Sequence, residues 1–396
     1  MQQILVLNSG SSSLKFQLFL MPNETVLCSG LIERIGLEDA KFKYETKAGA
    51  IEVVTPILNH NAALELLSKQ LLDKETGIIK SAEDIDIVAH RVVHGGKHFS
   101  KTAEITKEVK DKIEALSSLA PLHNPANLEG IKVAESIFKN AKQVAVFDTA
   151  FHQTIPEHAY KYAIPNEFSD KHNIRLYGFH GTSHKYVSEK AIEFLGKKES
   201  NIITIHLGNG CSMSAVKNGK SIDHSLGFSP INGLIMGTRS GDIDQSIIFY
   251  LAEKLKMSLD EINTLLLKKS GMLGLTGYSD LRDIEEKALE GDKACELALK
   301  MNTYRIKKYI GSYAAILNGL DAIVFTAGIG ENSNYMRELI CNDLDFLGIK
   351  LDLDKNNERL KTIRSINSEV SKVKILVIPT NEELEIAKQS FQLLKK

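Results

Sequence analysis

A strand–turn–strand unit that occurs twice, about two hundred residues apart, constrains the fold most strongly. The first copy spans residues 4–19 (ILVLNSGSSSLKFQLF) and the second residues 202–216 (IITIHLGNGCSMSAV). Each has an apolar strand, a turn of small residues and a return strand. Small side chains let backbone N–H groups approach an anion, and glycine adopts turn geometry at little steric cost. Two such turns in two halves of one chain indicate a phosphate chain bound from both sides of a cleft.

Neither turn is a Walker A sequence, and neither opens a helix as a Rossmann glycine loop does. One turn of this kind is equally compatible with an ordinary tight hairpin. The pair, together with Lys15 just past the first turn, favours nucleotide phosphates.

Composition limits the class of protein. A chain of 396 residues favours two domains. Its 49 Lys and Arg balance 50 Asp and Glu, so no basic footprint for nucleic acid exists. The four cysteines form no C-x-x-C pair and indicate free thiols in a reducing compartment. No apolar run is long enough for a bilayer and no signal-like start is present. We therefore expect a cytoplasmic protein without nucleic-acid or membrane partners.

Apolar runs alternate with helical patterns. The runs predict strands at residues 4–7, 14–20, 85–93, 144–147, 202–207, 322–326 and 375–378. Helical spacing predicts helices at residues 62–72, 109–119, 128–138, 187–195, 262–267 and 294–317, with a capping box at Ser258 and Glu261 and a terminal cap at Gly319. This alternation is typical of α/β sheets with helices on their faces.

The repeat also suggests where the domains divide. If each hairpin opens one α/β domain, the first domain covers residues 1–150 and the second residues 151–381. The last strand and helix could pack on either half, and Glu382 and Glu383 are expected in a polar loop. The long segment 294–317 is either a core helix or a dimer helix.

Polar clusters follow several predicted strands. Arg91 lies inside an apolar strand, where an unpaired charge is costly, so it is either a structural ion-pair partner or an anion clamp. Asp148 follows a buried strand, where α/β sheets place ligand-binding groups, although a turn or a helix cap would also explain it.

Three further segments carry candidate groups. His180 lies between small residues and is either structural or chemical, and Ser183 is expected to cap the helix that follows. Arg239 is flanked by glycines and is either positionable or paired with Asp242 or Asp244. Residues 323–333 predict a strand, a glycine turn and a helix that could hold a nucleoside.

The candidate groups are two arginines, a histidine and a lysine, with few acids. This set favours phosphoryl transfer over hydrolysis, because in phosphoryl transfer the protein mostly positions the reacting groups and neutralises charge. The hydrolase and deaminase signatures GxSxG, HExxH and PCxxC do not occur.

The chain resembles the acetate kinase family over essentially its whole length. The resemblance rests on VLNSGSSSLKF, AHRVVHGG, PLHNPAN, VFDTAFH, YGFHGTSH, IHLGNGCSM, SPINGLIMGTRSGDID, FTAGIGENS and IPTNEE, which occur in this order. It implies two related actin-like (ribonuclease-H-like) α/β domains with a nucleotide cleft between them, the first joined by segment 382–396. It also implies a homodimer that transfers phosphate from ATP to acetate, reversibly and with Mg²⁺ or Mn²⁺, giving acetyl phosphate and ADP.

The resemblance further implies roles for individual residues. Catalytic roles fall on Arg91, Asp148, His180 and Arg239. Arg91 would also bind the substrate carboxylate, and the pocket for the acetate methyl group would comprise Val93, Leu122, Phe179 and Pro230. The nucleotide would contact Lys15, His206, Leu207, Gly208, Asn209, Gly210, Asp280, Leu281, Arg282, Gly328, Ile329, Gly330, Glu331 and Asn332. The metal would be held near Asn8 and Glu382.

A carboxylate is already an anion at neutral pH, so its attack on phosphorus needs little proton removal. We therefore expect Asp148 to orient Arg91 or a metal-bound water rather than to act as a base. Two alternatives stay open: a propionate or butyrate kinase, since one methylene is worth only about 1–3 kcal/mol in an apolar pocket, and a nucleotide-gated binding protein without turnover.

Overall fold

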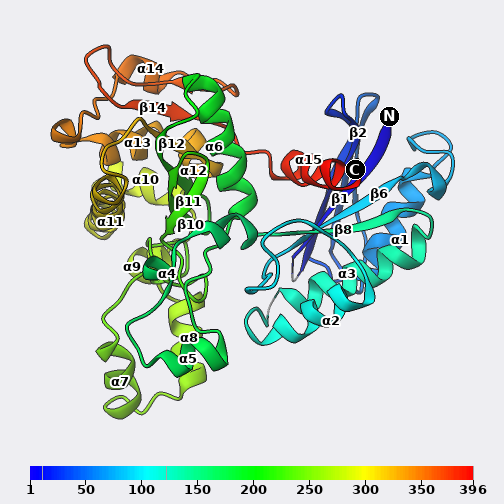
Figure 1. The fold of residues 1–396 in the computed structure, drawn as a ribbon, viewed down its shortest axis with the longest axis horizontal. Helices are drawn as coiled ribbons and strands as arrows, with labels where there is room; N and C mark the ends of the chain where they lie inside the picture. Colours follow the sequence, from blue (N-terminus) through cyan, green and yellow to red (C-terminus); the bar gives the residue numbers. More distant parts are fainter. Residues whose placement is uncertain (11, 122, 396) are drawn as a thin grey trace. The chain divides into compact units, whose positions relative to one another are not determined.

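The computed structural model describes residues 1–10, 12–121 and 123–395. They form two compact units (Figure 1). Unit 1 comprises Met1–Phe151 and Asn381–Lys396, and unit 2 comprises His152–Thr380. The chain thus leaves unit 1 once and returns to it for the final helix.

Unit 1 contains a sheet with the strand order β5-β4-β3-β2-β1-β6-β8-β7. Strands β1, β6 and β8 run parallel, and the remaining neighbours pair antiparallel. The strands are β1 (Gln2–Ser9), β2 (Ser13–Met21), β3 (Thr25–Glu33), β4 (Lys41–Thr46), β5 (Gly49–Val54), β6 (Ile87–Val92), β7 (Ala103–Glu104) and β8 (Lys142–Phe147).

Helices cover both faces of this sheet. They are α1 (His60–Leu71), α2 (Lys107–Ala115), α3 (Asn124–Ile137) and α15 (Glu382–Leu394), with 3₁₀ turns at Ala82–Asp84 and Leu116–Ser118. Side chains alternate along a strand, so Leu5 and Leu7 pack with Leu64 and Leu67 of α1 in one buried core. The final helix, α15, packs against β1, β2, β6 and β8, and Figure 1 shows it across the sheet from α1.

Unit 2 contains a second sheet with the strand order β11-β10-β9-β12-β14-β13. Strands β9, β12 and β14 are parallel, and the flanking strands pair antiparallel. The strands are β9 (Asn201–Leu207), β10 (Cys211–Lys217), β11 (Lys220–His224), β12 (Ala322–Thr326), β13 (Arg364–Ser365) and β14 (Lys374–Val377).

Helix α6 (Gly181–Leu195) contacts β9 and β12, whereas α11 (Lys293–Leu317) contacts β9 and β10. Figure 1 shows these two helices on opposite sides of the sheet. The other helices of the unit are α4 (Glu157–Tyr160), α5 (Asn166–His172), α7 (Ser246–Glu253), α8 (Leu259–Lys268), α9 (Gly271–Thr276), α10 (Leu281–Leu289), α12 (Ala327–Asn332), α13 (Asn334–Cys341) and α14 (Leu353–Asn357), with a 3₁₀ turn at Asp345–Leu347. A further 3₁₀ turn, Ala150–Thr154, includes the last residues of unit 1 and the first of unit 2.

The two sheets repeat one topology. The run β3-β2-β1-β6-β8 in unit 1 matches β11-β10-β9-β12-β14 in unit 2 in strand order and direction. The duplicated sequence unit forms the hairpins β1–β2 and β9–β10. The expected fold class, α/β with two related actin-like domains, is confirmed.

Two local expectations were wrong. Glu382 and Glu383 do not lie in a loop but open α15, where carboxylates stabilise the positive end of the helix. The left-handed residue that ends α11 is Asn318, one position before Gly319. Among the described residues, none of the helices is long and apolar enough to cross a membrane.

Candidate active site

The first group of candidate residues lies in unit 1 where β1, β6 and β8 end. Asn8 is opposite Lys15 in the β1–β2 register, and β6 places Arg91 beside the end of β1. Asp148 directly follows β8. The carboxyl ends of parallel strands share one edge of a sheet, which is where α/β folds collect ligand-binding groups.

Arg91 is the centre of this group. Its Nε donates to both carboxylate oxygens of Asp148, at 2.9 and 3.1 Å, and its Nη2 donates to Asp148 Oδ2 at 2.5 Å. Its Nη1 donates to Asn8 Oδ1 at 3.0 Å. Burial alone lowers the pKa of Arg91, but the Asp148 carboxylate reverses this and raises it, so the guanidinium stays charged. A guanidinium has five N–H groups, and these contacts with described residues use three of them.

The start of α15 adds two carboxylates. Glu383 lies 2.9 Å from Lys15 Nζ and is buried, whereas the Lys15 side chain is 49% exposed. Burial, opposed by Arg91 and reinforced by Asp148, raises the pKa of Glu382 to about 7. A cation bound next to Glu382 would stabilise the ionised form of its carboxylate.

Oxygen ligands at Asn8 and Glu382 fit Mg²⁺, which takes one or two protein oxygens and retains water and substrate phosphate ligands. Within the described ranges, no cluster of three or more His, Cys, Asp or Glu is arranged to hold a metal. A site of the magnesium–phosphate kind does not require such a cluster.

Two asparagines of α3 hold the strand ends in place. Asn127 accepts a bond from Val93 N at 3.1 Å and donates to Ser9 O at 2.8 Å. Asn124 accepts a bond from His94 N at 3.1 Å and donates to His94 O. These roles were not predicted, although both residues stand in the PLHNPAN string. Val93 is buried beside them, and Leu122 lies outside the described residues.

The second group lies in unit 2. His180 adopts a left-handed conformation (φ 56°) directly before α6, which begins at Gly181. Ser183 is therefore not the helix cap that we expected. It lies inside the first turn, fully buried, and its hydroxyl contacts His206 Nδ1 at 2.8 Å and Thr380 Oγ1 at 2.9 Å.

His180 and Arg239 meet at the β9–β10 turn. A Cβ atom at Gly210 would lie 3.5 Å from His180 Nε2 and 3.9 Å from Arg239 Nη1. The His180 ring also stacks on His206, with centroids 4.5 Å apart. Arg239 Nη1 donates to Pro230 O at 3.0 Å, so this arginine pairs with neither Asp242 nor Asp244 within the described chain. The turn thus gathers a guanidinium and an imidazole in one place.

The other predicted residues of this group surround the turn. His206 and Leu207 belong to β9 rather than to the turn, and both are buried. Gly208 N donates to Gly210 O at 3.2 Å and closes the turn. Phe179, adjacent to His180, is also buried.

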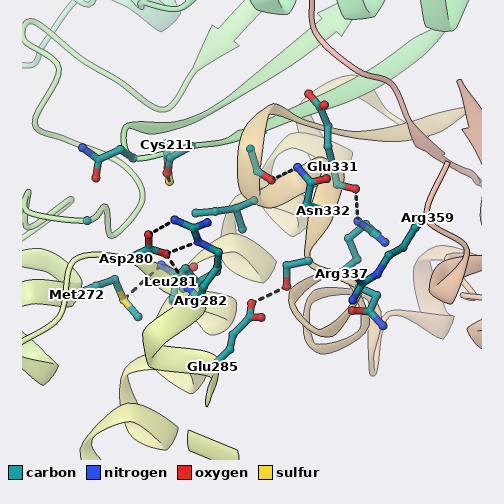
Figure 2. Close-up of a pocket in the computed structure, with 18 of the residues that line it drawn as sticks. Cys211, Met272, Asp280, Leu281, Arg282, Glu285, Glu331, Asn332, Arg337 and Arg359 are labelled. Carbon is teal, nitrogen blue, oxygen red and sulfur yellow. Dashed lines mark hydrogen bonds and ion pairs between the residues drawn. The ribbon is translucent and has the colours of Figure 1, made fainter. Parts of the chain in front are cut away.

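A cavity of about 980 Å³ lies next to the turn and is large enough for a nucleotide. Nine predicted nucleotide-binding residues line it: Gly208, Asn209, Asp280, Leu281, Arg282, Gly328, Ile329, Glu331 and Asn332. Figure 2 shows Asp280 and Arg282 at one side of the cavity and Arg337 and Arg359 at the other. Gly330 is buried within α12 and faces the strands instead.

The expected glycine turn before this helix is absent from the described residues 323–333, because β12 passes directly into α12. The left-handed residue there is Ala327, with φ 64°. The cavity also includes residues that the sequence did not indicate, among them Glu285, Arg337 and segment 356–361.

Arg337 is among the largest fully buried side chains of the protein. Its guanidinium donates to the backbone oxygens of Gly330 and Glu331, at 3.0 Å each, and to both oxygens of Asn356, at 2.8 and 2.9 Å. Burial, followed by the charge of Arg364, lowers its pKa to about 10. Arg337 therefore joins α12 and α14, two walls of the cavity.

Comparisons with known proteins agree with this architecture. Residues 3–388 match the model of the acetokinase family. An acetate kinase of Flavobacterium johnsoniae is 64% identical, over 99% of this chain and all of the relative. The crystal structure of Porphyromonas gingivalis acetate kinase superposes with a TM-score of 0.94 at 46% identity, covering all of both chains. A propionate kinase from Francisella tularensis gives 0.93 at 46% identity, over 98% of this chain and 99% of the other.

These matches extend over essentially the whole chain and include both units. The chain belongs to the acetokinase family and is a phosphotransferase of the acetate kinase type, with a carboxyl group as acceptor.

Proposed function

We propose that the chain transfers the γ-phosphoryl group of ATP directly to acetate, reversibly and with Mg²⁺, giving acetyl phosphate and ADP. The domain boundaries are proposed to lie near residues 150 and 382. Unit 1 is proposed to supply the residues that bind the substrate carboxylate and the metal, and unit 2 those that bind the nucleotide.

The observation that carries this proposal is the bonding of Arg91. In the contacts among the described residues, Asp148 and Asn8 engage three of its five N–H groups. Two N–H groups therefore remain that could bind the carboxylate of the substrate. Bidentate binding of a carboxylate suits the planar guanidinium. Val93, Leu122, Phe179 and Pro230 are proposed to contact the acetate methyl group.

Asp148 is proposed to orient Arg91 rather than to remove a proton. Both of its oxygens already accept hydrogen bonds from Arg91, and acetate has no proton to lose at neutral pH. The carboxylate would therefore fix the orientation of the guanidinium.

The charge of the moving phosphoryl group is proposed to be neutralised by Arg239 and His180 at the β9–β10 turn. Groups placed in advance where charge develops stabilise a transition state without reorganising, and an arginine in this role is worth roughly 10³–10⁵ in rate. Lys15, Gly208, Asn209 and Gly210 are proposed to bind the phosphates. Residues 280–282 together with Gly328, Ile329, Glu331 and Asn332, which line the cavity, are proposed to bind the nucleoside.

Mg²⁺ is proposed to be held by Asn8 and Glu382 with the nucleotide phosphates, and it would supply charge neutralisation at the β- and γ-oxygens. We further propose a cytoplasmic homodimer. The four cysteines are free and buried, which suits a reducing compartment.

A hydroxylamine trap tests the activity. Purified protein is incubated with ATP, MgCl₂ and acetate, propionate or butyrate, and the acyl phosphate is captured as hydroxamate. We expect hydroxamate with acetate at the highest kcat/KM. Absence of hydroxamate with all three acids would refute the proposal, and a preference for propionate would assign the chain to the second candidate, which the propionate kinase neighbour favours.

A further inference from the structure

A row of short hydrogen bonds leads from His180 into the interior of unit 2. His180 Nδ1 lies 2.8 Å from Ser212 Oγ, which lies 2.7 Å from His184 Nε2. The other ring nitrogen of His184, Nδ1, lies 2.7 Å from Thr204 Oγ1. Ser212, His184 and Thr204 are fully buried. We call this row of four residues the Ser212 relay.

The number of protons in the Ser212 relay follows from the protonation state of its histidines and hydroxyl groups. Burial, followed by repulsion from neighbouring histidines, lowers the pKa of His184 well below its usual value, so the ring is neutral and carries one N–H. Each hydroxyl also carries one proton. If Ser212 donates to one histidine, it must accept from the other. When the His180 ring is neutral as well, both rings therefore carry their single proton on the same ring nitrogen, either Nδ1 in both or Nε2 in both.

The two possible directions are not equivalent. In the first, Thr204 donates to His184 Nδ1, His184 Nε2–H donates to Ser212, and Ser212 donates to His180 Nδ1. In the second, every bond is reversed, and the Thr204 hydroxyl proton must turn to Ser214 O at 3.4 Å. Hydroxyl bonds are ordinarily 2.5–3.0 Å long, and a buried donor without a good partner is costly. The first direction keeps every hydroxyl proton in a short bond.

We propose that Ser212, His184 and Thr204 are positioning residues that keep the proton of His180 on Nε2. This inference rests on the proposed role of His180 at the phosphoryl group. The His180 ring presents Nε2 to Gly210 in the β9–β10 turn, beside Arg239. A proton on Nε2 makes the neutral ring a donor toward a phosphoryl oxygen, whereas the opposite tautomer would present a lone pair to an anion.

The wild-type protein provides the decisive test. Long-range ¹H–¹⁵N correlation spectra of the full chain, labelled with ¹⁵N-histidine and recorded without substrates at neutral pH, report which ring nitrogen carries the proton. Signals are assigned with His180→Gln and His184→Gln. We expect both histidines to be protonated on Nε2, with Nδ1 accepting a hydrogen bond. A proton on Nδ1 of either ring overturns the proposal.

Variants connect the relay to catalysis. Ser212→Ala removes the donor to His180 Nδ1, so the Nδ1 signal should shift and kcat should fall about two- to tenfold, with KM for ATP and acetate nearly unchanged. Ser212→Thr keeps the hydroxyl and should restore both. The matched control is Ser188→Ala, because this buried serine on α6 donates only to Lys185 O in the described contacts. It should change neither readout.

The outcomes separate the relay from the activity. Wild-type spectra without the Nε2 tautomer refute the relay even when hydroxamate forms, and unchanged His180 signals in Ser212→Ala do the same. The expected tautomers in a protein that makes no acyl phosphate leave the relay standing and refute the proposed function. If Ser212→Ala does not fold, the wild-type spectra and Ser212→Thr still decide.

Discussion

Replacing the buried Arg337 by methionine should destabilise unit 2 and weaken nucleotide binding. Methionine fills most of the arginine volume but cannot donate to the four oxygens that Arg337 bonds in α12 and α14. Glu331 O keeps a hydrogen bond from Arg364 Nη2 at 3.3 Å, whereas Gly330 O and the two oxygens of Asn356 lose their side-chain donor. Each buried acceptor left in this way costs about 1 kcal/mol or more. Removing a poorly hydrated charge returns part of that cost. We therefore expect a net loss of about 3 kcal/mol in the free energy of unfolding.

The loss can be measured by urea unfolding followed by circular dichroism, since the sequence contains no tryptophan. The matched control is Arg359→Met, because Arg359 lines the same cavity but is exposed, and such changes usually stay within about 0.5 kcal/mol. Because Arg337 holds two cavity walls, KM for ATP should rise while KM for acetate stays constant. A loss of less than about 1 kcal/mol, or one equal to the control, would refute this account.

Three other changes have clear expectations. Asp148→Asn should reduce kcat severely while ATP affinity stays within a few-fold, and unchanged turnover would remove Asp148 from the mechanism. Burial raises the pKa of Asp223 to about 6, above its value of about 3.9 in an unfolded chain. The native state therefore binds the carboxyl proton of Asp223 more tightly than the unfolded state does. As a result, the free energy of unfolding falls as pH rises from about 4 to 6. Asp223→Asn should therefore raise the melting temperature above pH 6 but not near pH 4, and equal gains at both would contradict the assignment. Gly30→Ala places a Cβ against the Phe16 ring and Lys43 O and should cost about 1–3 kcal/mol in a thermal scan, whereas a neutral result would show that β3 moves freely.

The central parts of both sheets could be predicted from the sequence because their strands are buried on two faces and read as apolar runs. Strands β3, β4 and β5 were missed because few of their residues are buried. Only Cys28 and Ile32 are buried in β3, only Phe42 and Tyr44 in β4, and none in β5. The outer strands of a sheet carry a weaker signal than its centre for this reason.

Within the candidate site, the sequence indicated which residues carry charge but not what each one contacts. Ser183 matched a helix-cap pattern, yet the helix begins earlier because His180 takes the left-handed conformation before Gly181. Arg337 reads as an ordinary surface residue of an amphipathic helix, and only tertiary packing reveals that its side chain is buried. In both cases the environment of the side chain depends on contacts between segments that are distant in the sequence.

The return of the chain to unit 1 affects the order of biosynthesis. Helix α15 covers β1 and β2 and carries Glu383, the partner of Lys15. The ribosome makes these strands first and this helix only after all of unit 2. Unit 1 therefore keeps one face of its sheet uncovered until residues 381–395 have been synthesised. All segments of unit 2 have been synthesised before that point. In contrast to the usual amino-terminal-first sequence of domain folding, the half that is translated later can be completed earlier.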